Sequence, residues 1–213
     1  MSIQLKSMPA KGFPRRPADD YDAIRPHLRT GDLLFCSGSV WMSEMIQTAT
    51  GSAWSHVGFV WHLKPIDRVM VLESVESQGV RTVPLSKYLR DYDNRGHPYP
   101  GGVVVARHTK FPGEQAETVL RKFGQHSVDR FGYPYDRDEI AKITARIAGS
   151  FLPFTKTKKR ELKRDKEFIC SEYVWECYRA IGIEIAHDDL GFIAPVHFAR
   201  DPNVKLIAVL RKK

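Results

Sequence analysis

Short apolar runs separated by turn residues dominate the chain between residues 31 and 107. Residues 33–38 are apolar or small, and runs rich in β-branched and aromatic residues follow at 55–61, 68–74, 79–83 and 103–107. Gly51, Pro65 and Gly79 stand between these runs. Runs of this length and composition, bounded by glycine and proline, are typical of consecutive antiparallel strands.

The second half of the chain has a helical period instead. Apolar residues recur every three or four positions at 114–123, 140–151 and 168–181. This spacing puts the apolar side chains on one face of a helix. We also expect short helices at 40–48, capped by Ser39, and at 85–90, and a last strand at 204–210. The pattern predicts an α+β fold with an antiparallel sheet packed against helices.

Length and composition indicate one folded domain. The chain has 213 residues and 42% are hydrophobic, so it can bury enough apolar surface to offset the entropy lost on folding. A disordered or low-complexity protein is thereby excluded. Residues 1–29 are polar and proline-containing, and they predict an N-terminal arm. Regular structure is expected from Gly31 onward, within a single domain at 30–213.

Cysteine usage and the N-terminus bear on the compartment. Cys36, Cys170 and Cys177 are too few for a closed disulfide framework, which favours a reducing environment. The first twenty residues lack the apolar stretch of a signal peptide, and the longest uncharged window, 45–63, is too polar to span a bilayer. We therefore expect a cytoplasmic protein, with non-classical export as the alternative.

Cys170 is the first candidate for chemistry, because it lies at the expected N-terminus of the 168–181 helix. Unpaired N–H groups and the helix dipole there favour a thiolate, which is the nucleophilic form of cysteine. The alternative is a small buried packing residue, the more common role of a free cysteine. For Cys177, two turns further along the helix, and for Cys36, at the end of a strand, packing is the favoured interpretation.

A thiolate nucleophile needs a partner that transfers protons, and His56 is the best placed histidine. It opens a strand in which Gly58 permits close approach of a neighbour. His62 shares its face by strand alternation and is the main competitor. Glu73 is the candidate for orienting the imidazole, since a carboxylate in an apolar strand is costly without a partner. Glu76 is the fallback, and a solvent-facing Glu73 is equally compatible with alternation.

Several short motifs, taken in order, resemble a known family. They are Gly31-Asp32-Leu33-Leu34-Phe35, Trp54-Ser55-His56-Val57-Gly58, Leu72-Glu73-Ser74, Gly79-Val80 with Pro84-Leu85, Gly132-Tyr133-Pro134-Tyr135-Asp136 and Phe168-Ile169-Cys170-Ser171-Glu172. Together they resemble the YiiX and YebB group, which are circularly permuted NlpC-type papain-like cysteine hydrolases. In that group the strands precede the cysteine helix, as His56 precedes Cys170 here. The resemblance implies a permuted papain-like fold with the nucleophile at a helix N-terminus.

The same resemblance implies roles for individual residues. Cys170 would be the nucleophile, His56 the general base and Glu73 the residue that orients the histidine. Tyr135 would line the site and assist the oxyanion hole, with Tyr133 as the other candidate. The backbone N–H of Cys170 would be a further oxyanion donor.

Positive charge is concentrated just before the cysteine helix. The chain carries 33 Lys and Arg against 25 Asp and Glu, a net charge of +8. The basic residues of this segment are Lys156, Lys158, Lys159, Arg160, Lys163, Arg164 and Lys166. A cationic cluster after an apolar helix end is suited to an anionic membrane surface, although a solvated loop fits equally well. No nucleic-acid-binding pattern and no spacing for a metal site occurs, and no cofactor is expected.

The sequence therefore predicts a cysteine hydrolase, an amidase or peptidase that cleaves an amide of a wall-like or γ-glutamyl peptide through an acyl-thioester on Cys170. The first alternative is a lipid-directed thiol hydrolase or acyltransferase, similar to the lecithin:retinol acyltransferase group. The second is a non-catalytic binding module on the same fold. A cysteine, a histidine and a carboxylate together favour the enzyme over the module.

Overall fold

The computed structural model describes residues 5–113, 115–136, 168–187 and 192–212. Its strands are β1 (Lys6–Ser7), β2 (Leu33–Gly38), β3 (His56–Leu63), β4 (Arg68–Val75), β5 (Gly79–Pro84), β6 (Gly101–His108) and β7 (Val204–Arg211). Its helices are α1 (Tyr21–Ile24), α2 (Trp41–Thr50), α3 (Leu85–Arg90), α4 (Glu117–Val128), α6 (Cys170–Arg179) and α7 (Pro195–Arg200). Short 3-10 turns are η1 (Arg25–His27), η2 (Lys64–Ile66) and η3 (Tyr92–Asn94). The α+β class and the expected strands are confirmed.

One antiparallel sheet forms the centre of the molecule. Its seven strands lie in the order β1-β7-β6-β2-β3-β4-β5. The middle strand β2 pairs with β3, so that Cys36 lies opposite His56, and β3 pairs with β4, so that Phe59 lies opposite Leu72. The register places the start of β3 beside the end of β4, which brings residues 56 and 73 to the same end of the sheet.

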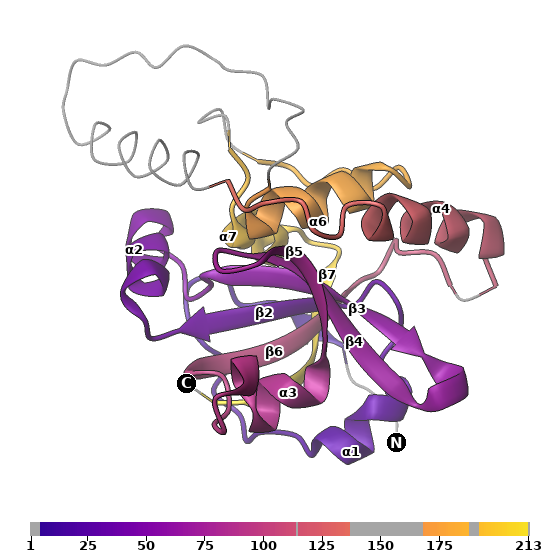
Figure 1. Cartoon of the computed structure of the whole chain (residues 1–213). Coiled ribbons are helices and arrows are strands. Elements are labelled where there is room, and N and C mark those ends of the chain that lie inside the picture. The colour runs from indigo at the N-terminus through magenta and orange to yellow at the C-terminus, as the bar shows by residue number, and fades with distance from the viewer. Residues whose placement is uncertain (1–4, 114, 137–167, 188–191, 213) are drawn as a thin grey trace, which may run out of the picture.

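Helices cover both faces of this sheet (Figure 1). Helices α4, α6 and α7 lie on one face, where Phe59 of β3 packs with Phe123 and Tyr173. Helices α1 and α3 lie on the other face, where Leu34 and Tyr88 belong to a second buried cluster. Alternating side chains of the central strands thus enter two different cores, which explains why β2 is buried along its whole length.

The N-terminal segment has regular structure before Gly31, contrary to the expectation. Strand β1 pairs with β7 at one edge of the sheet, and helix α1 begins after Asp20, whose carboxylate accepts the N–H of Asp22. Met8 is buried, and the carbonyl of Pro9 accepts the indole N–H of Trp54 at 2.6 Å. The arm is therefore packed onto the sheet by contacts with residues far along the chain.

Two helix boundaries differ from the sequence pattern. Ser39 does not cap α2, because its hydroxyl donates instead to the Pro100 carbonyl at 2.8 Å and the helix begins at Trp41. Helix α4 begins at Glu117 rather than 114 and continues to Val128. The helix expected at 140–151 lies outside the described residues. Within the described ranges, no helix is long and apolar enough to cross a membrane.

Candidate active site

Cys170 is the first residue of α6, and its side chain is buried against the sheet. The residue is 5% exposed. A residue at this position has no acceptor within the helix for its own N–H, and the field of the helix terminus favours a negative charge. Helix α6 packs on β3 and β4 through Tyr173 and Val174, and this packing holds the cysteine beside the start of β3.

His56 and Glu73 complete a linear arrangement with this thiol. The His56 ring donates through Nε2 to Glu73 Oε2 at 2.7 Å and makes a second side-chain hydrogen bond to Cys170. Because Nε2 faces Glu73, Nδ1 is the ring nitrogen left for the thiol. The structure thus brings together the three residues that the sequence analysis singled out.

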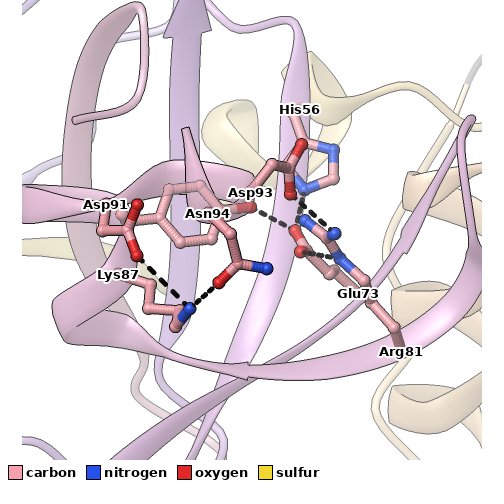
Figure 2. A network of polar contacts seen from close by, with 8 residues as sticks. His56, Glu73, Arg81, Lys87, Asp91, Asp93 and Asn94 are labelled. Carbon is pink, nitrogen blue, oxygen red and sulfur yellow. Dashed lines mark hydrogen bonds and ion pairs between the residues drawn. The ribbon is translucent and has the colours of Figure 1, made fainter. Parts of the chain in front are cut away.

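Glu73 faces the interior, not solvent, and has three donors. Besides His56, the Nε of Arg81 donates to Oε1 at 2.9 Å, and the hydroxyl of Tyr88 donates to Oε2. Glu73 is fully buried, with no exposed surface. Figure 2 shows Glu73 between His56 and Arg81. Both carboxylate oxygens are therefore satisfied, as a buried charge requires.

Gly58 makes room for this arrangement. A Cβ atom at position 58 would lie 3.0 Å from the Leu72 carbonyl oxygen and 3.2 Å from the Glu73 Cβ. The glycine that the sequence analysis associated with close approach therefore lies against the strand that carries Glu73. A larger residue would displace Glu73 or its strand.

The electrostatics favour a thiolate and an imidazolium. Burial alone would lower the pKa of His56, but the hydrogen bonds and charges of Cys170 and Glu73 raise it to about 10. Burial alone would raise the pKa of Cys170, but His56 and the backbone N–H groups of Val57 and Ser171 lower it. The two groups stabilise each other's charged forms, which is the state of an activated cysteine nucleophile.

Of the two candidate tyrosines, Tyr135 is the one whose pKa is affected by the charge of Cys170. Burial and the negative charge of Cys170 raise the pKa of Tyr135, so its hydroxyl stays protonated. Tyr133 has a structural role in the same segment. Its ring stacks on Phe168 with centroids 6.2 Å apart, and its carbonyl accepts the N–H of Val80 at 2.8 Å.

The remaining candidates lie elsewhere or are chemically unsuited. His62 is at the far end of β3, where Nδ1 donates to the Leu28 carbonyl at 2.8 Å. Glu76 is exposed. Burial raises the pKa of both Cys36 and Cys177, which keeps these thiols protonated. The basic segment, Lys156, Lys158, Lys159, Arg160, Lys163 and Arg164, lies outside the described residues, and its membrane contact stays a prediction.

Two residues of the site were missed by the sequence analysis, namely Arg81 and Tyr88. Arg81 is a charged residue in a short apolar strand, which is the same signal that singled out Glu73. Tyr88 follows from no local pattern, because helix α3 reaches Glu73 only through the fold. Among the described residues, no group of three or more His, Cys, Asp or Glu side chains is arranged to hold a metal ion.

Comparison with known proteins places this chain in a family. The model of the permuted papain-like amidase family, YaeF/YiiX, C92, matches residues 27–142, more than half of the chain. The chain therefore belongs to this family of papain-like amidases, which are cysteine-type hydrolases. The matched residues include His56 and Glu73 and end before Cys170, so the place of the cysteine in the site rests on the geometry given above.

A solved structure supports the permuted papain-like fold. The crystal structure described as metalloprotein yiiX from Escherichia coli O157:H7 is similar to this chain, with a TM-score of 0.52 and 23% sequence identity. The similarity covers 85% of this chain and 89% of that one. No curated protein matches the chain.

Proposed function

We propose that the protein hydrolyses an amide bond through an acyl-thioester on Cys170, with His56 as the proton-transfer group and Glu73 as its positioning residue. One observation carries this proposal. A single imidazole is hydrogen-bonded to a buried carboxylate and, at the same time, to a thiol at a helix N-terminus. Nucleophile, base and orienting group in this order are the arrangement of thiol hydrolases.

The reaction follows from the charge state of the pair. The Cys170 thiolate attacks the carbonyl carbon and forms a C–S bond, and the His56 imidazolium gives its proton to the amide nitrogen as the C–N bond breaks. Water then attacks the thioester carbon while His56 accepts a proton from it. The C–S bond breaks, the acid is released, and the thiolate–imidazolium pair is restored.

The negative oxygen of each tetrahedral intermediate needs hydrogen-bond donors. The N–H of Cys170 is one candidate, because the first residue of a helix has no acceptor within it. The hydroxyl of Tyr135 is the other, since its raised pKa keeps it a neutral donor. Together they would supply one backbone and one side-chain donor.

The proposed substrate is a peptide amide of the wall-like or γ-glutamyl type. The description of the family as amidases supports cleavage of an amide rather than an ester. The protein would be incubated with a γ-glutamyl amide, a wall-like peptide and vesicles of an acyl phospholipid, and the intact protein would be weighed by mass spectrometry. We expect a covalent acyl adduct with a peptide substrate, absent in the Cys170→Ala variant.

Two results would contradict this proposal. Turnover that persists in Cys170→Ala would remove the thioester mechanism. If the phospholipid forms an adduct and neither peptide does, the thioester mechanism holds, but the substrate is a lipid and not a peptide.

A further inference from the structure

The contacts of Glu73 extend beyond Cys170 and His56, through Arg81, to Asp93 (Figure 2). The guanidinium of Arg81 donates through Nε to Glu73 at 2.9 Å and through Nη1 to Asp93 Oδ1 at 2.8 Å. The side chain of Arg81 is 8% exposed and that of Asp93 is 17% exposed. With a charged pair at Cys170 and His56, five groups of alternating charge lie in series from the thiol to the loop that carries Asp93.

We propose that Arg81 and Asp93 are positioning residues that hold Glu73 ionised and aimed at His56, and that they thereby set the reactivity of Cys170. This inference rests on the proposed function, because it concerns the same nucleophile. Neither residue touches the reacting atoms, so both act through Glu73.

Stability alone does not account for this ion pair. Taking charges out of water costs free energy, and a well-packed apolar pair at such positions is often at least as stable. Arg81 also has a buried Nη2 with no hydrogen-bond partner in the described part of the chain. A buried donor without an acceptor costs free energy, which adds to the cost of burying this ion pair. What Arg81 adds is a fixed cation on the far oxygen of the carboxylate that His56 uses.

The loop that carries Asp93 has a tightly turned backbone. Asp93 and Asn94 have φ angles of 53° and 59°, in the left-handed region that Asp and Asn adopt more readily than other residues with a side chain. Lys87 contacts Asp91 and Asn94, and Asp91 accepts the N–H of Gly96 at 2.8 Å, so the loop is fixed at several points. These contacts hold the loop in a shape in which the Asp93 carboxylate accepts the Nη1–H of Arg81.

Charge explains how the effect reaches the thiol. A fully buried carboxylate tends to take up a proton, and the Arg81 cation opposes this. If Glu73 is neutralised or turns away, the imidazolium loses its counter-charge and the thiolate loses its partner. Direct repulsion between Arg81 and the imidazolium acts the other way, but the Glu73 carboxylate lies between the two cations. The net result of losing Arg81 is therefore a weaker thiolate–imidazolium pair.

Other ionisable groups also face this network. They are Cys36 from β2, Tyr88 from α3, Tyr92 from η3, Tyr99 just before β6, and Tyr135, on which the charges of Glu76, Asp136 and Glu172 also act. Burial raises the pKa of Cys36 and of the four tyrosines, so these groups stay protonated through the neutral range. The variants below leave all of them unchanged.

Alkylation of Cys170 by iodoacetamide, measured against pH in the full chain, tests the inference without a substrate. The alkylation rate should rise with pH as the Cys170 thiolate forms. We expect Arg81→Met to move the midpoint of this rise up by about one pH unit, which makes alkylation about tenfold slower below the wild-type midpoint. Arg81→Lys should restore part of the shift. Asp93→Asn, which keeps the side-chain shape, should slow alkylation by about threefold, or half a pH unit. The matched control is Asp67→Asn, at another left-handed aspartate (φ 46°) that pairs with Arg25.

The outcomes separate this inference from the proposed function. Arg81→Lys and Asp93→Asn profiles equal to wild type, or midpoints that fall, would overturn the positioning role, whether or not Arg81→Met folds. A shift in Asp67→Asn as large as in Asp93→Asn would also overturn it. If wild-type Cys170 itself reacts with the pH profile of a free thiol, the proposed function fails. If the wild-type profile depends on His56 but not on Arg81 or Asp93, only the positioning role fails.

Discussion

Glu73 is a fully buried carboxylate, and its neighbours determine what it does. Arg81 holds one oxygen, while His56 and Tyr88 contact the other. Strand alternation left open whether this side chain faces solvent or the core. The three partners come from β3, β5 and α3, so its burial follows from long-range contacts that no local pattern contains.

Replacing Glu73 with glutamine should impair the histidine more than it disturbs the shape of the site. In the glutamine variant the amide oxygen would face Arg81, because the Nε–H of Arg81 needs an acceptor. The amide N–H₂ would then point toward His56 Nε2. His56 would then carry its proton on Nδ1 and could not accept one from Cys170. We expect kcat/KM for the amide substrate to fall by about 100-fold or more, as for other wrong-tautomer variants.

The matched control for this substitution is Glu76→Gln, at the exposed glutamate that the sequence offered as the fallback. It should leave kcat/KM close to the wild-type value. A Glu73→Gln variant with wild-type kcat/KM and unchanged pH dependence would contradict the role assigned to Glu73.

The start of β5 fixes the position of the segment that carries Tyr133 and Tyr135. Val80 donates to the Tyr133 carbonyl at 2.8 Å and accepts the N–H of Gly132 at 2.9 Å. Gly79 has a φ angle of +69°, and a Cβ atom there would lie 2.0 Å from the Tyr133 carbonyl oxygen. Glycine is required at this position both for the backbone conformation and for the close approach of the two segments.

The Gly79→Ala variant should therefore lose both stability and activity. The left-handed conformation alone costs about 1–2 kcal/mol for alanine, and the displaced segment would move Tyr135 relative to Cys170. Gly182→Ala is the control, because Gly182 has a φ angle of +83° and no atom within 4 Å of the added Cβ. Thermal unfolding should show a larger loss for Gly79→Ala, with reduced kcat in that variant alone. Equal losses in both would refute the close-approach argument.

At the level of elements, the sequence predicted most strands and the cysteine helix, because turn residues and helical spacing are local signals. It missed β1, α1 and α7, which are two, four and six residues long and too short to show a period. It also placed a cap at Ser39, whose hydroxyl is used by Pro100 instead. The errors lie where tertiary contacts override local preference.

A second buried ion pair, between Asp32 and Arg107, lies far along the sheet from Cys170. Arg107 of β6 donates to both oxygens of Asp32, from Nε at 2.6 Å and Nη2 at 2.8 Å, and to the His27 carbonyl at 3.0 Å. Asp32 also accepts the N–H of Arg29 at 2.8 Å. This cluster ties the N-terminal segment to the central strands.

Removal of the cation should destabilise the protein in a pH-dependent way. Burial raises the pKa of Asp32 despite its contacts with Arg107, so the folded state favours the protonated carboxyl. A group whose pKa is higher in the folded than in the unfolded protein contributes most to stability below its pKa in the unfolded chain. This contribution is lost as the pH rises through its pKa in the folded protein. We expect Arg107→Met to cost about 3–5 kcal/mol at neutral pH and less in acid, in denaturant titrations. The double variant with Asp32→Asn should recover part of the loss, and an equal loss at both pH values would refute this account.

The order of the fold could also be predicted at this scale. The resemblance of the ordered motifs to the YiiX and YebB group implied the permuted papain-like fold, with the histidine strand before the cysteine helix. The sequence could not reveal that Arg81 and Asp93 continue the charge series, since β5 reaches Glu73 and η3 reaches Arg81 only when the sheet and α3 are assembled.

The most direct test of the account is the titration of the Cys170 thiol, followed by the ultraviolet absorbance of the thiolate against pH. Cys36 and Cys177 have raised pKa values and should stay silent below the range of free thiols. The account predicts one thiolate that forms below the usual cysteine pKa of about 8.5, is absent in Cys170→Ala, and moves to higher pH in His56→Ala. A wild-type protein with no thiolate below that pH, or one whose thiolate survives in Cys170→Ala, would contradict it.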